Sequence, residues 1–184
     1  MRAGGKAAVA LALFASTASC KPAAPSAWAQ GGAYLEIPRA RWVYGNLLVE
    51  LDWDGKVRIG GEHALSLDRA GRVFTPGGAP IAILLPTGQL VGTADDPLGT
   101  VGAATAARAG EHAAWLQLFD TGEVARFRDG GGALPFGVWI GCAELRSRQA
   151  CTLVTHVIAL GHREVARDAP PVSIGIGVGA GMWH

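Results

Sequence analysis

The sequence has few charged residues, few aromatic residues and little cysteine. Charged residues make up 17% of the 184 positions, aromatic residues 7%, and the formal net charge is +1. No segment is strongly basic, and nucleic-acid binding normally needs a clustered cationic surface. The apolar run near the N-terminus, residues 7–15, is far shorter than the roughly 20 residues that span a bilayer. We therefore expect neither a nucleic-acid partner nor a lasting transmembrane helix.

Several motifs that carry catalysis or bind cofactors are also absent. The sequence contains no Gly-x-Ser-x-Gly elbow, no phosphate-binding P-loop and no His-Glu-x-x-His metal motif. Residues 52–55 begin like a calcium loop, but the remaining acidic ligands and the closing Glu are missing. We therefore expect no cofactor and no catalytic residues, and a hydrolase that uses Glu and His groups is kept as an alternative.

Two Glu-His pairs are the candidates for metal or acid–base chemistry. Glu62 and His63 lie in the same sequence context as Glu111 and His112, directly after a glycine. If the fold brought both pairs into one cleft, their imidazole and carboxylate groups would suit a metal ion or a hydrolytic site. The same pattern also arises if the repeat duplicates exposed turn residues that have no chemical role. We therefore predict no metal site and keep His63 and His112 as the candidate ligands.

The first twenty residues have the layout of an export signal. Arg2 and Lys6 form a positively charged start, the apolar run follows, and small residues end at Cys20. The sequence Thr-Ala-Ser-Cys resembles a bacterial lipobox, whose cysteine becomes the acylated first residue of the mature chain. Thr17 departs from the family pattern, which usually has Leu or another aliphatic residue there. The resemblance to bacterial envelope lipoprotein precursors implies a signal peptide over 1–19, lipid on Cys20 and attachment to a membrane.

A second cleavage site competes with the first. Residues 27–29, Ala-Trp-Ala, fit an ordinary signal peptidase, which would release a secreted protein after Ala29. Residues 20–32 are rich in proline, alanine and glycine, a composition that buries too little apolar surface to order itself. A flexible tether directly after an anchor cysteine is the usual lipoprotein layout. We therefore favour a periplasmic or outer-membrane-attached lipoprotein over a secreted protein.

Cysteine usage agrees with export. If Cys20 carries lipid, Cys142 and Cys151 remain, and an even pair in an oxidising compartment favours a disulfide. The two residues flank a polar stretch of eight residues. We predict a disulfide between Cys142 and Cys151, and the alternative is two free thiols.

A degenerate repeat of about seventeen residues runs through the middle of the chain. A Gly-x-Val or Gly-x-Leu element begins at Gly55, Gly71, Gly88 and Gly122, with spacings of 16, 17 and 34. The spacing predicts a missing copy within 102–117. Glycine suits hairpin turns because it adopts positive φ at little cost. Between the turns, apolar and polar residues alternate in short runs, which is typical of strands with one buried face.

These repeats predict an all-β domain over 33–167. We expect an antiparallel meander of short hairpin repeats, stacked into a twisted sheet or an open barrel. A short helix near 103–114 or near 142–155 is the alternative for those two segments. For residues 151–160 we favour a strand that pairs with 137–142 across the disulfide.

The remaining segment, residues 168–184, alternates glycine with apolar residues and is expected to form a last strand or a tail. Trp53, Trp115 and Trp139 are expected in the core, because large aromatic side chains fill the interior of a domain rich in glycine and alanine. His156 lies within an apolar run and is expected to bond a neighbouring group.

The repeat region resembles envelope lipoproteins built from short Asp/Gly-turn β-repeats, a loose class that names no activity. Our leading hypothesis is a non-catalytic protein with a structural or interaction role in the cell envelope. Its partners would be a membrane, through the lipid anchor, and an envelope protein or glycan. One alternative is a module that binds a small ligand or glycan in the curl of the sheet. The other is the envelope hydrolase.

Overall fold

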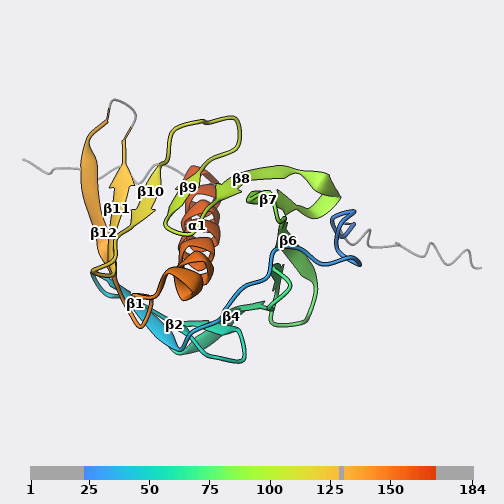
Figure 1. Cartoon of the computed structure of the whole chain (residues 1–184), viewed down its shortest axis with the longest axis horizontal. Coiled ribbons are helices and arrows are strands. Elements are labelled where there is room, and N and C mark those ends of the chain that lie inside the picture. The colour runs from blue at the N-terminus through green and yellow to red at the C-terminus, as the bar shows by residue number, and fades with distance from the viewer. Residues whose placement is uncertain (1–22, 129–130, 169–184) are drawn as a thin grey trace, which may run out of the picture.

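The computed structural model describes residues 23–128 and 131–168. Twelve antiparallel strands close into a barrel, and one long helix runs through it (Figure 1). The strands are β1 (Ala40–Tyr44), β2 (Leu47–Leu51), β3 (Lys56–Ile59), β4 (Glu62–Leu67), β5 (Arg72–Phe74), β6 (Pro80–Leu84), β7 (Gln89–Gly92), β8 (Pro97–Val101), β9 (Thr105–Ala107), β10 (Leu116–Leu118), β11 (Glu123–Phe127) and β12 (Ala133–Ile140). A 3₁₀ turn, η1 (Thr93–Asp95), joins β7 to β8, and the helix α1 spans Leu145–Asp168.

Each strand pairs with its neighbours along the chain, and the ring closes where β1 meets β12. Trp42 of β1 lies opposite Trp139 of β12 in this last antiparallel ladder. The predicted all-β antiparallel meander is confirmed. The barrel is closed rather than open, and closure leaves no strand with an unpaired edge.

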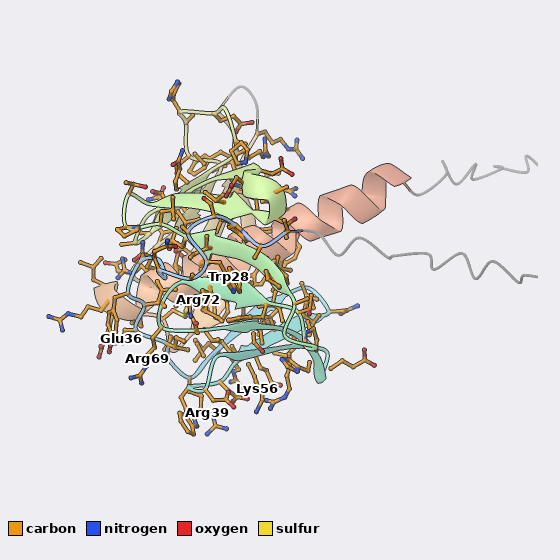
Figure 2. All side chains as sticks on the ribbon, turned by 90° about the vertical axis from the view of Figure 1, so that its right-hand side faces the viewer. Trp28, Glu36, Arg39, Lys56, Arg69 and Arg72 are labelled. Carbon is orange, nitrogen blue, oxygen red and sulfur yellow. A yellow bond between two sulfur atoms is a disulfide. The ribbon has the colours of Figure 1, made fainter. Side chains whose placement is uncertain are left out.

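The turns of the meander lie at two opposite ends of the barrel. The entry end holds the turns β2–β3, β4–β5, β6–β7, β8–β9 and β10–β11, and the exit end holds β1–β2, β3–β4, β5–β6, β7–β8 and β9–β10. Because α1 follows β12, it enters the barrel at the entry end and leaves at the exit end. Figure 2 shows the last part of the helix projecting beyond the barrel.

The repeat glycines form the turns of the entry end. Gly55 has a φ of +85°, and its amide donates to the Asp52 carbonyl at 2.8 Å, which closes the turn. The Gly55 carbonyl accepts from the Leu67 amide at 2.8 Å, and Gly122 accepts from Trp139 in the same way at 2.7 Å. A Cβ atom at Gly55 would overlap the carbonyl oxygen of Leu67. This turn therefore needs glycine both for its φ and for the close approach of the next strand.

The missing copy of the repeat lies at the β8–β9 turn. Ala104 takes the place of the glycine there, and its carbonyl accepts from the Leu118 amide at 2.7 Å. The helix considered for 103–114 is wrong, because the segment forms β9 and the loop that follows it. A strand at this position continues the ladder from β8 to β10, which a helix would interrupt.

Helix α1 occupies the segment for which a strand was favoured. The strand over 151–160 is wrong, and the helix alternative near 142–155 is confirmed, with the helix continuing to Asp168. Nearly all side chains from Ala150 to Ile158 are buried, on every side of the helix. A helix that is buried on every side belongs in an interior, and the barrel provides one. These surroundings outweigh the strand preference of the Thr, Val and Ile residues in the segment.

Residues 23–32, expected as part of a tether, lie instead against the outer face of β5 and β6. Trp28 packs edge-on against Phe74 with ring centroids 5.0 Å apart, and Arg72 Nε donates to the Trp28 carbonyl at 2.8 Å. Figure 2 shows Trp28 and Arg72 close together on this face. Ile83 alternates with core residues and so points outward, yet it is fully buried beneath the segment.

The chain then crosses the entry end before it joins β1, as the blue segment in Figure 1 shows. The Leu35 amide donates to the Arg69 carbonyl at 2.9 Å in the β4–β5 turn. The side chains of Leu35 and Ile37 are buried in the barrel core. The entry end is therefore covered by this crossing segment together with the start of α1.

Several sequence predictions fall outside the described residues, namely the signal peptide over 1–19, Cys20 and the Gly-rich segment after Asp168. Across residues 23–128 and 131–168, no helix combines the length and the apolar character needed to cross a bilayer.

Candidate functional site

The candidate site is an apolar cavity at the exit end, between α1 and the barrel wall. Its volume is about 620 Å³, within the range of roughly 300–1,000 Å³ that is usual for small-molecule sites. It is lined by Ile59, Ala64, Leu65, Ile81, Gly92, Thr93, Asp96, Leu98, Val157, Ile158, Leu160 and Gly161. These residues come from β3, β4, β6, the end of β7, the β7–β8 turn, β8 and the last buried turns of α1.

The cavity exists because α1 lies against one side of the barrel. His156 Nε2 bonds the Leu98 carbonyl of β8 at 3.0 Å, and the Trp115 indole, next to β10, donates to His156 Nδ1 at 2.9 Å. Thr152 Oγ1 donates to the Ala103 carbonyl at 3.2 Å. These bonds hold the helix toward β8, β9 and β10, and the space toward β3, β4 and β6 stays unfilled.

Most of the side chains that line the cavity are aliphatic. Thr93 and Asp96 are the polar side chains that contribute to it, and the exposed Asp96 lies where its carboxylate stays in contact with water. No charged side chain is buried in the cavity wall formed by the described residues. Such a cavity favours an apolar group, because a polar ligand would leave hydrogen-bonding groups unmatched.

The rim of the cavity is attached to the N-terminal segment. In η1, the Ala94 amide donates to the Ala23 carbonyl at 3.0 Å, and the Ser26 amide donates to Asp95 Oδ1 at 2.7 Å. Ala94 and Asp95 have positive φ values of 57° and 62°. Left-handed backbone at non-glycine residues costs about 1 kcal/mol or more per residue. The hydrogen bonds to the N-terminal segment therefore fall at a strained part of the rim.

A buried polar network connects α1 to the barrel. The indole N–H of Trp115 can only donate and the carbonyl of Leu98 can only accept, so His156 is neutral with its hydrogen on Nε2. Burial away from water lowers the pKa of His156 below its ordinary value of 6.5. The Trp139 indole donates to Thr155 Oγ1 at 2.8 Å. The bonds of His156 agree with the expectation from the sequence, and its position makes it a structural group.

The two Glu-His pairs are not brought together. His63 of β4 lies with its Nε2 2.9 Å from Ser66 Oγ, whereas His112 is exposed on the β9–β10 loop. Four strands, β5 to β8, separate β4 from β9 around the sheet. In the described part of the chain, no three or more His, Cys, Asp and Glu side chains gather in a group that could hold a metal ion.

Cys142 and Cys151 form the predicted disulfide. It joins the loop after β12 to the second turn of α1, with both residues fully buried. The bond therefore fixes the helix at the entry end, far along the axis from the cavity. The predicted lipidation site, Cys20, lies three residues before Ala23 in the sequence.

The tryptophans of the barrel belong mostly to its core. Trp42, Trp115 and Trp139 are buried, as predicted for the last two. The expectation for Trp53 is wrong, because its side chain is 71% exposed at the β2–β3 turn. None of the described residues that line the cavity is aromatic, so they offer no platform of the kind that stacks on sugars.

Sequence reasoning missed the cavity residues for a clear reason. They come from strands far apart in the chain and from a helix that was expected as a strand, so no local pattern marks them. One signal in the sequence could have found the helix. Residues 151–160 are mostly apolar, and in a helix these apolar residues would lie on every side, which is typical of a buried helix.

Comparison of the chain with protein-family models, with curated proteins and with solved structures finds no match.

Proposed function

We propose that this protein is a non-catalytic envelope protein that is held at a membrane by lipid on Cys20 and acts through interaction rather than chemistry. The observation that carries the non-catalytic part is that α1 takes up most of the barrel interior, with the cavity at the exit end as the space that remains. Helix α1 occupies the space in which a barrel of this kind would otherwise hold a ligand or an active site. The polar groups of the helix named above are bonded to the barrel or to the helix backbone.

The membrane attachment rests on the lipobox-like end of the signal and on the position of the first described residues. The chain leaves the barrel at the rim of the exit end, where Ala23 bonds Ala94. Cleavage after Ala29 would remove Ala23, Ser26 and Trp28, all of which contact the barrel. Cleavage before Cys20 would keep these contacts, which supports the lipoprotein alternative over secretion.

The cavity supports a second function, a binding module for a small apolar group. Its aliphatic lining and its lack of aromatic platforms favour an apolar ligand over a glycan. A protein can combine both functions if the same end of the barrel faces the membrane and holds the apolar group.

Metabolic labelling with a radioactive fatty acid tests the anchor. We expect the wild-type protein to incorporate the label and Cys20→Ser to lose it, because the serine hydroxyl does not replace the thiol in lipoprotein acylation. A wild-type protein without label, or equal label on both proteins, would contradict the proposal. The mass of the mature chain then separates cleavage before Cys20 from cleavage after Ala29.

A further inference from the structure

We infer that the cavity at the exit end holds an acyl chain of the lipid carried by this protein's own Cys20. The inference rests on the proposed acylation of Cys20 and names the occupant of the cavity. It would make the exit end the membrane-facing end of the barrel.

The first support is reach. Cys20 precedes Ala23 by three residues, and three residues of extended chain span at most about 11 Å. The Ala23 carbonyl is bonded to the Ala94 amide at 3.0 Å, and Ala94 follows Thr93, which lines the cavity. Cys20 is therefore no more than about 11 Å along the chain from Ala23, so an acyl chain attached there is within reach of the cavity rim.

The second support is chemistry. Apolar surface accounts for most of the lining, with Ile59, Ile81, Leu98 and Leu160 among the side chains that form it. Burying an acyl chain against such surface is favourable, because each CH₂ group that leaves water for an apolar environment lowers the free energy. A polar headgroup would find only Thr93 and Asp96, and the carboxylate of Asp96 would repel an anionic one.

The third support is the way the rim is built. The backbone of Ala94 and Asp95 is held in the left-handed region, and both residues bond the N-terminal segment. The contacts place Ala23, the first described residue, beside the mouth of the cavity, at the end from which α1 projects (Figure 2). An anchor attached there would be delivered to the cavity at high effective concentration.

Photocrosslinking of the full chain in cells tests this arrangement. Cells are fed a fatty acid with a diazirine near its end, the protein is purified from the membrane fraction after irradiation, and crosslinked residues are mapped by mass spectrometry. We expect lipid at Cys20 and crosslinks to cavity residues such as Ile81, Leu98 and Leu160. Cys20→Ser should lose these crosslinks.

Two matched variants test the cavity itself. Ala64→Trp places an indole in the cavity, whereas Ala109→Trp places one on the exposed β9–β10 loop outside it. We expect acylation of both variants, loss of the cavity crosslinks in Ala64→Trp and their retention in Ala109→Trp. If Ala64→Trp fails to fold, the crosslink maps of wild type and Cys20→Ser decide the question without it.

The outcomes separate the two proposals. Lipid on Cys20 without crosslinks to the cavity would overturn the inference and leave the anchor intact. A chain without lipid on Cys20 would overturn both. Equal cavity crosslinks in wild type and Cys20→Ser would show that a free fatty acid is bound, which would overturn the assignment to the protein's own anchor.

Discussion

The imidazole of His156 shows how a single buried residue can make this fold sensitive to acid. Both ring nitrogens have fixed partners, the Trp115 indole at Nδ1 and the Leu98 carbonyl at Nε2. A proton added to Nδ1 would face an N–H group that cannot accept it. The positive charge of Arg108 also opposes protonation, in addition to the burial that lowers the pKa of His156.

We predict that stability falls as the pH is lowered below about 6.5, the ordinary pKa of histidine, and levels off once the pH is below the lowered pKa of folded His156. In this window the unfolded chain binds more protons than the folded chain, so acid favours unfolding by up to about 1.4 kcal/mol per pH unit. The free energy of unfolding is measured by urea denaturation at several pH values from 7.5 down to about 5.5, above the main range of carboxylate titration.

The variant His156→Gln removes the titrating group and keeps an amide that can accept from Trp115 and donate to Leu98. We expect its stability to change less with pH across this window than that of wild type. His112→Gln, at an exposed position on the β9–β10 loop, is the matched control and should keep the wild-type slope. An equal slope in His156→Gln and wild type would show that another group is responsible.

At the scale of the hairpin, the glycine turns at the two ends of the barrel differ in how closely the next strand approaches. Gly55 and Gly78 have nearly the same φ, +85° and +81°. A Cβ atom at Gly55 would overlap the Leu67 carbonyl, whereas one at Gly78, in the β5–β6 turn, would have no heavy atom within 4 Å. The pair therefore separates the cost of backbone strain from the cost of steric overlap.

We predict that Gly78→Ala lowers the free energy of unfolding by about 1–2 kcal/mol, the cost of a left-handed alanine. Gly55→Ala should cost about 2 kcal/mol more than that, because the β3–β4 ladder must also move apart. Chemical denaturation of both variants under oxidising conditions measures the difference. Equal losses of unfolding free energy in the two variants would mean that the strands around Gly55 relax without cost. Gly55 would then be needed only for its φ.

The same elements show what the sequence could and could not predict. The turns at Gly55 and Gly122 were predictable because a positive φ is a local requirement that glycine meets at little cost. The short strands followed from the alternation between turns. That this segment forms a helix was not predictable in the same way. Thr152, Val154 and Ile158 favour a strand locally, and only the surrounding barrel favours the helix α1.

At the scale of the whole molecule, closure of the ring was the step that sequence could not determine. The pairing of Trp42 with Trp139 joins strands that are almost a hundred residues apart, and the register of every ladder between them contributes to it. The cavity depends on the same global geometry, since it is the space left when α1 lies against β8, β9 and β10. Neither property has a sequence pattern of its own.

This architecture makes α1 and the barrel a single cooperative unit. The helix is surrounded by strands, joined to them by the bonds of Thr152, Thr155 and His156, and fixed at the entry end by the Cys142–Cys151 disulfide. We expect it to leave the interior only when the ring of strands opens. Residues 23–32, in contrast, lie on the outer face and can detach without breaking any ladder of the barrel.

We therefore predict that amides of the buried part of α1 exchange with solvent only through global unfolding, with the same free energy and the same denaturant dependence as amides of β11. Residues 23–32 should exchange through local opening, with a lower free energy and little denaturant dependence. Native-state hydrogen exchange followed by mass spectrometry, at increasing guanidinium chloride below the unfolding transition, measures both classes in one sample. If amides of the helix exchanged at a lower free energy than those of β11, with a smaller denaturant dependence, this would show that α1 leaves the barrel while the ring of strands stays closed. The interior would then be available to ligands from solution, which is the property that the filled barrel argues against.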